Sequence, residues 1–477
     1  MSLSRRMFLG RAASTAAAAG AFSLPTLLSA PAFAQDGSAP QTPFEAGGRT
    51  GWTSHAAELD FFDSILGPKS PNRFTMDVIG QTDLDDCVRR DGSEGTLPVH
   101  LFAFGTDHTG DVATPGTRPT VYILCSQHGN EPAGREAGIE LIRDLAFTTD
   151  PTLLDLLSKV NIIVTPTANP RGRQRNAREN GVTDINRDHL NLRTREARAY
   201  AEAGNVWRPY MIVDHHEYGP GQPVLYDDDV LYLWPRNLNV DEQVRAGAKE
   251  FCLDYIKADC EAAGYTADEY GLAKVGPNYG PLQTPIGAPT GVQTAGDWDD
   301  GIARNATGLR NAMGILVESA VSARPHDPSE ATNNLFRRVA SQRVVMDAAI
   351  RHLSEKGQDS MAITAGAPVR RAEDGAAQGT VWFDGQDEAH PSTSLASLQP
   401  QTFDDPGAKE YRIPASALTQ GEGMHGTLTG VLGLHEVDWT VDGDQAVFSM
   451  AQQSKNVIPL LLDSRAERST VNGTASY

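Results

Sequence analysis

Two histidine-containing motifs, far apart in the chain, carry the residue types that bind a catalytic zinc ion. The first is Gln127-His128-Gly129-Asn130-Glu131, and the second is Asp214-His215-His216-Glu217. A His and a Glu three residues apart, joined by a distant His, can supply three zinc ligands and leave the fourth position open. Structural zinc sites fill all four positions with protein ligands, so this pattern indicates a catalytic zinc, one per chain.

The choice of the third ligand follows from strand geometry. Side chains alternate between the two faces of a strand, so only one of His215 and His216 can face the site. We favour His216 as the ligand and expect His215 to be packed elsewhere. Asp214 then shares the side of His216 and can support that imidazole by a hydrogen bond.

Glu318 is the candidate general base. It follows the apolar residues 314–317. A carboxylate at the end of a buried strand costs folding free energy unless it pairs with another group, so an unpaired one there suggests a functional role. Beside zinc, it can take a proton from the attacking water and pass it to a leaving amine. The residues together predict a zinc-dependent amide hydrolase.

An arginine-rich stretch between the two motifs could bind an anionic substrate. Asn186-Arg187 suits a carboxylate, because a guanidinium binds a carboxylate through two parallel hydrogen bonds. Another arginine near the zinc could stabilise an oxyanion. For Arg171, Arg173 and Arg175 we favour salt bridges on an acidic surface.

The predicted elements bring these residues to one edge of a sheet. Apolar segments predict buried strands at residues 121–126, 160–165, 210–214 and 314–317, and helical spacing predicts a helix over residues 132–145. Strands that alternate with helices indicate an α/β domain with a largely parallel sheet. Functional groups of such sheets collect at the carboxyl ends of strands, and the candidate residues each come just past such an end.

Four segments are expected along the chain: a signal peptide (1–34), a flexible mature N-terminus (35–50), the catalytic domain (51–355) and a small β-domain (356–477). The helix at residues 330–354 should end at Gly357. Short apolar runs at residues 379–383, 426–432 and 446–450 predict the strands of the β-domain, and residues 458–462 should pack on a core.

The first residues predict export. Ser4-Arg5-Arg6-Met7-Phe8-Leu9 is a twin-arginine pattern, and Ala32-Phe33-Ala34 offers the small residues that a signal peptidase reads. The apolar stretch between them is short and contains Pro25, which argues against a membrane span after processing. We therefore expect the twin-arginine machinery as a partner and a periplasmic or secreted protein.

Composition excludes some functions. The formal net charge of −20 over 477 residues disfavours nucleic acid or an anionic membrane surface as a partner.

The spacing of the four cysteines matches no cysteine zinc site, and Cys125 is expected to be a buried small hydrophobe. Cys252 and Cys260 would lie roughly 12 Å apart along one helix, too far for a disulfide unless the chain turns back.

In this order, five motifs resemble the zinc carboxypeptidases of the carboxypeptidase A-like family: His128-x-x-Glu131, Asn169-Pro170-x-Gly172, Asp184-x-Asn186-Arg187, Asp214-x-His216 and Glu318. The resemblance covers roughly residues 95–325. It implies an eight-stranded mixed sheet between helices, zinc held by His128, Glu131 and His216, and a peptide substrate from which C-terminal residues are released.

The same resemblance assigns further roles. Asn186 and Arg187 would hold the terminal carboxylate of the substrate, and Glu318 would be the general base. Arg178 matches the oxyanion arginine better than Arg175 does. Two departures stand out: the family often has Asp at the position of Arg171, and its mobile tyrosine has two candidates, Tyr270 and Tyr279.

Two alternatives use the same residues differently. Residues 128–132 and 169–171 also resemble aspartoacylase and succinylglutamate desuccinylase, which cleave N-acyl amino acids with similar zinc ligands. The predicted export and the added β-domain favour peptides over such metabolites. A non-enzymatic carbohydrate- or peptide-binding protein is disfavoured, because a candidate exists for every catalytic role.

Overall fold

A computed structural model of the chain describes residues 39–66, 69–70, 72, 74–106, 115–219, 226–270, 298–322, 334–384, 402–420 and 426–477. The predicted signal peptide and Tyr279 lie outside these residues. Within the described residues, no helix combines the length and the apolar character needed to span a membrane.

A mixed sheet of eight strands forms the centre of the molecule, as predicted. Its order is β1-β4-β6-β5-β7-β10-β8-β9, with parallel pairing from β6 through β5 and β7 to β10 and between β8 and β9. The strands are β1 (Thr75–Gln81), β4 (Pro98–Phe104), β5 (Thr120–Cys125), β6 (Asn161–Thr165), β7 (Met211–Tyr218), β8 (Val230–Leu233), β9 (Ala267–Glu269) and β10 (Met313–Ala320). A small hairpin, β2 (Cys87–Val88) with β3 (Glu94–Gly95), lies apart from this sheet.

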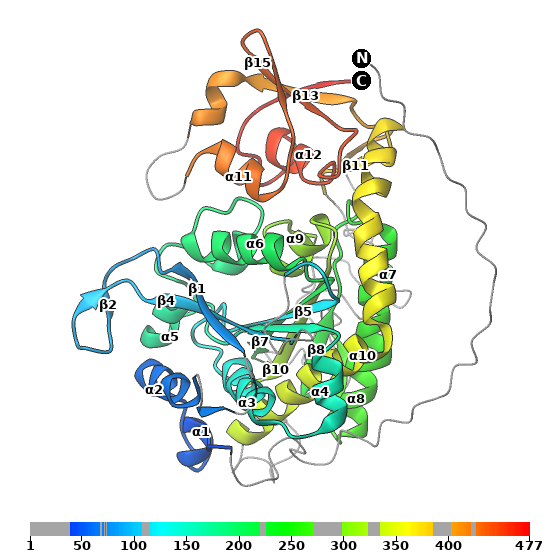
Figure 1. Cartoon of the computed structure of the whole chain (residues 1–477). Coiled ribbons are helices and arrows are strands. Elements are labelled where there is room, and N and C mark those ends of the chain that lie inside the picture. The colour runs from blue at the N-terminus through cyan, green and yellow to red at the C-terminus, as the bar shows by residue number, and fades with distance from the viewer. Residues whose placement is uncertain are drawn as a thin grey trace, which may run out of the picture.

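Helices cover both faces of the sheet, which explains why its middle strands are almost continuously buried. Every residue of β5, β6 and β10 is buried. Figure 1 shows α6 and α9 on one side of the sheet and α3 on the other. The helices of this part are α2 (His55–Ile65), α3 (Ala133–Phe147), α4 (Pro151–Leu157), α5 (Pro170–Arg175), α6 (Arg195–Trp207), α7 (Glu242–Glu250), α8 (Ala258–Ala262) and α9 (Ala303–Leu309), with the 3-10 turn η2 (Ile185–Arg187) and the π-helix η3 (Phe251–Lys257).

Two strands extend further than the sequence predicted. We expected the third strand to end at Asp214 and the fourth at residue 317, with the polar residues that follow lying beyond the strands. In the structure, β7 continues to Tyr218 and β10 to Ala320. β7 and β10 stay paired with each other to these ends, and the polar side chains there are buried and mostly hydrogen-bonded.

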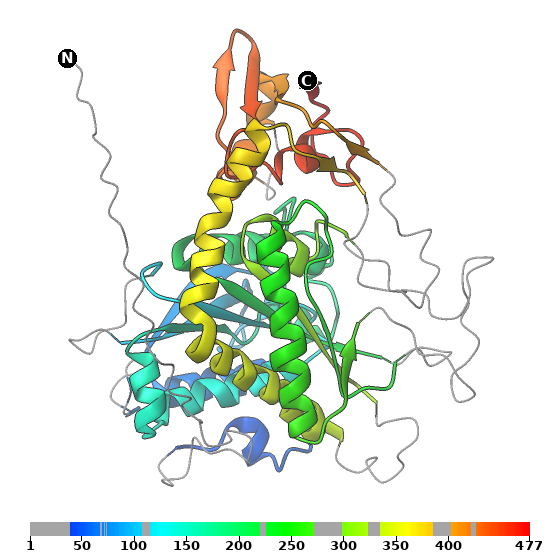
Figure 2. The same ribbon diagram turned by 90° about the vertical axis from the view of Figure 1, so that its right-hand side faces the viewer.

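Helix α10 (Asn334–Ala376) contradicts the predicted end at Gly357. A Cβ at Gly357 would meet Pro119 and Leu353 at 3.2 Å, so this glycine allows close packing and does not end the helix. The helix therefore crosses the domain boundary expected at residue 355. Figures 1 and 2 show α10 rising from beside the central sheet to the C-terminal region, which we define as residues 377–477.

The C-terminal region contains the predicted small β-sheet. Its four antiparallel strands have the order β14-β15-β13-β16, and a separate pair joins β11 to β12. The bounds are β11 (Val381–Trp382), β12 (Phe403–Asp404), β13 (Glu410–Pro414), β14 (Thr440–Asp442), β15 (Gln445–Ser449) and β16 (Thr474–Ser476), with the 3-10 turn η6 (Ala415–Thr419). The strand predicted at residues 446–450 is β15, and residues 458–462 form the buried helix α12 (Ile458–Leu462).

One strand prediction in this region is wrong. Residues 426–432 form the start of a helix, α11 (Leu428–Leu434), and not a strand. The Thr427 side chain accepts a hydrogen bond from Gly430 N, which caps the helix. Leu428, Val431 and Leu432 are buried at helical spacing, a period that the short apolar run had concealed.

The segment expected to be a flexible N-terminus is partly ordered. Its described part forms helix α1 (Pro43–Ala46), which Thr42 and Glu45 close with reciprocal hydrogen bonds. Phe44 is buried and stacks on Trp52 with ring centroids 5.7 Å apart. The capping hydrogen bonds and the Phe44–Trp52 contact therefore order this segment, although its Gly/Pro-rich composition predicted flexibility.

The four cysteines are buried and unpaired. Cys125 lies on β5 and is fully buried. Cys252 and Cys260 sit on the continuous helical segment formed by α7, η3 and α8. No turn of the chain brings these two thiols together.

A buried ion pair ties α2 to α3 beneath the sheet. Arg135 is completely buried, and its guanidinium donates to Glu58 Oε2 at 2.8 Å and to the Thr53 carbonyl at 2.7 Å. Burial opposes ionisation of Glu58, but Arg135 and His55 hold its pKa well below the usual range. The pair is therefore ionised inside the protein.

We expect Arg135→Met to destabilise the fold by about 3–5 kcal/mol, because it leaves Glu58 as an uncompensated buried charge. The measurement is urea unfolding at neutral pH. Arg90→Met is the matched control, since Arg90 also pairs with carboxylates but on the open surface. Arg90→Met should leave the urea midpoint nearly unchanged. An equal fall of the urea midpoint in both variants would contradict this interpretation.

Candidate active site

His128 and Glu131 lie in the loop between β5 and α3. Ser126 follows β5 with a φ of 58°, a left-handed conformation that turns the chain at the end of the strand. Gly129 is required here, since a Cβ would lie 1.9 Å from the backbone of Gly172. The Asn169 amide donates to the Gln127 and Arg178 carbonyls at 3.0 and 3.2 Å. Asn169 and Gly172 thus serve to hold this loop in place.

His216 comes from β7 and Glu318 from β10. The two strands are parallel neighbours, and His216 and Glu318 are direct register partners, so both side chains lie on the same face. His215 faces the other side, where its Nδ1 lies 2.5 Å from Gln342 Oε1 on α10. The alternation predicted from the sequence is therefore present, and it separates the two histidines.

The three candidate ligands converge. His128 Nδ1 and His216 Nδ1 are 3.0 Å apart, and the two Glu131 carboxylate oxygens lie 2.9 and 2.8 Å from them. All three residues are buried, and one donor atom from each falls within 4.8 Å of the others. Two imidazole nitrogens and a carboxylate directed at one point match the donors and the number of ligands of a catalytic zinc site.

Carboxylates behind the ligands fix the orientation of both imidazoles. His128 Nε2 lies 3.0 Å from Asp184 Oδ1, and His216 Nε2 lies 2.7 Å from Asp214 Oδ2. These contacts favour the tautomer with the proton on Nε2, and in that tautomer the Nδ1 lone pairs of both rings are directed to the common point. Two lone pairs facing each other at 3.0 Å repel unless a cation lies between them, so the residues present fit a divalent metal.

We expect Asp214→Asn to lower zinc affinity by about 10–100-fold, because the amide no longer holds the His216 tautomer firmly. Competition with a metal-binding dye measures this directly. Asp188→Asn is the control: Asp188 is also buried, but it accepts from Arg193 N and Thr194 N and touches no candidate ligand. A loss of affinity in the control of the same size would show a general effect of buried carboxylates.

Glu318 lies buried beside the ligands without a full set of partners. Its Oε2 is buried and has no hydrogen-bond partner among the described residues. The pKa of the Glu318 carboxyl is raised to about 8. Burial is the main cause, the nearby His216 opposes the rise, and the Glu131 charge adds to it. A carboxyl that is close to both proton states near neutral pH suits a group that accepts and then donates a proton.

Arg178 lies at the rim of the ligand cluster. Its guanidinium contacts Asp184 Oδ2 at 3.0 Å and Glu131 Oε1 at 3.4 Å, and its side chain is 46% exposed. Arg175, its competitor, instead bonds the Asp86 carboxylate and carbonyl. Arg171 also pairs with Asp86, at 2.6 Å. The salt bridges expected for Arg171 and Arg175 are present, but the Arg171 side chain is only 12% exposed and so does not lie on the surface. Of the two oxyanion candidates, Arg178 is the one that contacts the ligand cluster.

Asn186 and Arg187 form the turn η2 next to the ligands. The Asp184 carboxylate caps this turn by accepting from Asn186 N at 2.9 Å. Asn186 Oδ1 accepts from Ala303 N at 2.8 Å, and its amide nitrogen lies 3.2 Å from His216 Nε2. The Arg187 side chain is 38% exposed, with its Nε 3.3 Å from Asp299 Oδ2. Sequence reasoning missed Asp299, which no motif marks.

Tyr270 is the described one of the two tyrosine candidates. It packs in a small apolar cluster with Tyr218, Tyr226, Leu231 and Ala320. Burial and the nearby Glu318 charge raise the pKa of its phenol. Tyr270 therefore lies near the general-base candidate, and Tyr279 lies outside the described residues.

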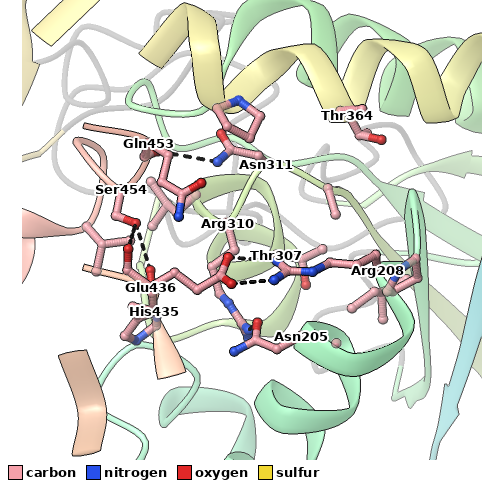
Figure 3. Close-up of a pocket in the computed structure, with 18 of the residues that line it drawn as sticks. Asn205, Arg208, Thr307, Arg310, Asn311, Thr364, His435, Glu436, Gln453 and Ser454 are labelled. Atoms are coloured by element: carbon pink, nitrogen blue, oxygen red, sulfur yellow. Dashed lines mark hydrogen bonds and ion pairs between the residues drawn. The ribbon is translucent and has the colours of Figure 1, made fainter. Parts of the chain in front are cut away.

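A cavity of about 290 Å³ lies away from this cluster, between α6, α9, α10 and the C-terminal region. Figure 3 shows Arg208, Arg310, His435 and Glu436 around it. Arg310 donates to the carbonyls of Ala201 and Leu434, so it joins α6 to α11. None of the candidate zinc ligands lines this cavity.

Comparison with known proteins agrees with the geometry. The zinc carboxypeptidase family model matches residues 93–203, a segment that holds His128, Glu131, Arg178, Asn186 and Arg187. A probable carboxypeptidase 2 of Trichophyton verrucosum is 32% identical over 218 residues, covering 44% of this chain and 40% of the relative. Carboxypeptidase D of Homo sapiens is 34% identical over 124 residues, covering 23% of this chain and 9% of the relative.

The chain spans less than half the length of these curated relatives. Among solved structures, a metallo-carboxypeptidase from Burkholderia cenocepacia aligns over 63% of this chain and 70% of its own, at 17% identity and a TM-score of 0.45. His216 and Glu318 lie beyond the segment matched by the family model, and the fold brings them to its ligands. Residues 93–203 of the chain are thus similar to the zinc carboxypeptidase family.

Proposed function

We propose that this protein is a zinc metallocarboxypeptidase that releases single residues from the C-terminus of peptides. The observation that carries the proposal is the meeting of His128, Glu131 and His216 at one point, with the buried Glu318 carboxyl beside them. Arg187 follows Asn186, whose amide nitrogen lies 3.2 Å from His216 Nε2, and its own side chain is 38% exposed. The chain thus offers a metal site, a proton acceptor and a carboxylate receptor together.

Zinc held by the three ligands would polarise the scissile carbonyl and make a water acidic enough to attack near neutral pH. Arg187, with Asn186 beside it, binds the terminal carboxylate and so selects the last peptide bond. Glu318 accepts one proton from the attacking water and delivers it to the leaving nitrogen. Arg178 neutralises the charge that develops on the carbonyl oxygen. A C–O bond forms, the C–N bond breaks, and the products are a shortened peptide and one amino acid.

The family match favours this activity over the deacylation of N-acyl amino acids. The test is a mass-spectrometric digest of a mixed peptide pool to which N-acyl amino acids have been added, with and without a zinc chelator. Chelator-sensitive loss of single C-terminal residues supports the proposal. Cleavage of the N-acyl amino acids with the peptides left intact would replace it by the alternative.

We also propose that the protein is exported through the twin-arginine pathway to the periplasm or beyond. The support is Ser4-Arg5-Arg6-Met7-Phe8-Leu9 with a small-residue cleavage site at Ala32-Phe33-Ala34. This pathway carries folded proteins, which would allow zinc to be loaded before export. Replacement of Arg5 and Arg6 by Lys should leave the unprocessed protein inside the cell. Normal processing of that variant, read by N-terminal sequencing, would rule the pathway out.

A further inference from the structure

The C-terminal region reaches the candidate substrate site through one side chain. Arg468 lies in the chain segment between α12 and β16, and its NH1 donates to the Arg187 carbonyl at 2.8 Å. The Arg468 carbonyl in turn accepts from Asn191 Nδ2 at 2.9 Å. Figure 1 shows the C-terminal region directly over α6 and α9, the helices beside this contact. The contact joins residues that are far apart in the sequence.

Asp299 lies between the guanidinium groups of Arg468 and Arg187. Arg468 binds it through two parallel hydrogen bonds, Nε to Oδ1 at 2.5 Å and NH2 to Oδ2 at 2.6 Å. Arg187 makes one longer contact, from Nε to Oδ2 at 3.3 Å. The carboxylate therefore binds Arg468 far more closely than Arg187. Arg468 also lies 3.4 Å from Asp300 Oδ1.

The backbone around this trio leaves little room for adjustment. A Cβ at Gly301 would lie 2.5 Å from the Arg187 carbonyl oxygen and 2.6 Å from Arg468 Nε. His189 N donates to the Gly301 carbonyl at 3.1 Å. The Arg468 side chain is only 19% exposed, whereas that of Arg187 is 38% exposed. Arg468 is thus enclosed by protein, and Arg187 is the more accessible cation.

A carboxylate next to Arg187 has a direct consequence for substrate binding. A guanidinium binds a carboxylate through two parallel hydrogen bonds, one to each oxygen. If Asp299 paired with Arg187 in this way, it would occupy the position that a substrate carboxylate needs. Arg468 already binds both Asp299 oxygens in this two-to-two arrangement, and Gly301 N also donates to Oδ1 at 2.8 Å. Its presence therefore leaves most of the hydrogen-bonding capacity of Arg187 to the substrate.

We propose that Arg468, supplied by the C-terminal region, is a positioning residue for the substrate-carboxylate site: it holds Asp299 and so keeps Arg187 available. The proposal rests on the carboxypeptidase function proposed above. It gives the C-terminal region a role in substrate binding that no motif in the sequence suggested. Removal of Arg468 would release Asp299 to Arg187 and weaken substrate binding without touching the zinc ligands.

The test compares Arg468→Met, Asp299→Asn and the double variant by steady-state kinetics. Arg468→Met should raise KM about tenfold with kcat changed less than about threefold, as expected for lost uniform binding. In the double variant, KM should return to within about threefold of Asp299→Asn alone, because the competing carboxylate is gone. Arg468→Lys, which keeps a charge for Asp299, should recover part of the loss.

Arg465→Met is the matched control. Arg465 also binds a carboxylate with two hydrogen bonds, to Asp404 at 2.7 and 2.8 Å, but within the C-terminal region. It should leave KM unchanged. Any of three results would overturn the proposal. They are an equal rise of KM in Arg465→Met, an unchanged KM in Arg468→Met, and a KM in the double variant as high as in Arg468→Met.

Binding to an inactive form separates this inference from the function on which it rests. In a Glu318→Gln background, calorimetry should show that a peptide with a free C-terminal carboxylate binds about tenfold more weakly after Arg468→Met. If the background protein does not prefer the free acid to the peptide amide, the proposed carboxylate site itself is wrong. If that preference exists and Arg468→Met leaves it intact, the positioning role alone is wrong.

Discussion

Glu318→Gln is expected to keep its zinc and to lose about 10²–10⁴-fold in kcat, the usual contribution of a positioned acid–base group. Glutamine has nearly the same shape as glutamate, but it cannot accept the proton of the attacking water. Zinc content comes from elemental analysis and kcat from release of a C-terminal residue. Near-normal turnover in this variant would remove Glu318 from the mechanism.

The chain offers a matched control for that substitution. Glu196 is likewise buried, and burial and the charge of Asp83 raise its pKa to about 8. It lies in the first turn of α6, hydrogen-bonded to Asn180 at 3.2 Å, and touches none of the candidate ligands. Glu196→Gln should therefore retain kcat. A loss in both variants would show that buried carboxyl groups matter for the fold and would leave the chemistry unassigned.

His216→Ala is expected to lower zinc affinity by more than about 100-fold and to abolish activity. Loss of the outer partners of a metal ligand costs about 10–100-fold, so loss of a ligand itself should exceed that range. The remaining His128 and Glu131 supply only two protein donors. The measurement is zinc retained after dialysis against a chelator of known affinity, with activity after zinc is returned.

The adjacent His215 provides the comparison. It is equally buried, but it faces α10 and bonds Gln342. His215→Asn should keep zinc, whatever it does to stability, because its side chain lies on the opposite side of β7. Zinc loss in His215→Asn with retention in His216→Ala would reverse the ligand assignment.

The ligand set could be predicted because its signals are local. The spacing of His128 and Glu131 lies within one loop, and the alternation of His215 and His216 follows from the period of a strand. The eight-stranded mixed sheet followed from the family resemblance, and the apolar strands β5 and β6 were visible in the sequence. Buried polar residues at the ends of β7 and β10 could not be told from loop residues, so those strands were predicted too short.

Tertiary packing decided the features that the sequence concealed. Gly357 looked like a helix end, yet it is the place where α10 approaches Pro119. The apolar run before His435 looked like a strand, yet Thr427 caps it as helix α11. No local sequence pattern marks Asp299 or Arg468. The role proposed for them depends on a contact between segments that are distant in the sequence.

The most direct test of the carboxypeptidase function uses two peptides that differ only at the C-terminus, one a free acid and the other an amide. With zinc-loaded protein, we expect the acid to lose its last residue and the amide to be cleaved at least about 100-fold more slowly, because Arg187 has no carboxylate to bind in the amide. A chelator should stop cleavage of the acid, and added zinc should restore it. Equal cleavage of acid and amide, or cleavage at internal bonds, would contradict release of C-terminal residues through the Arg187 site.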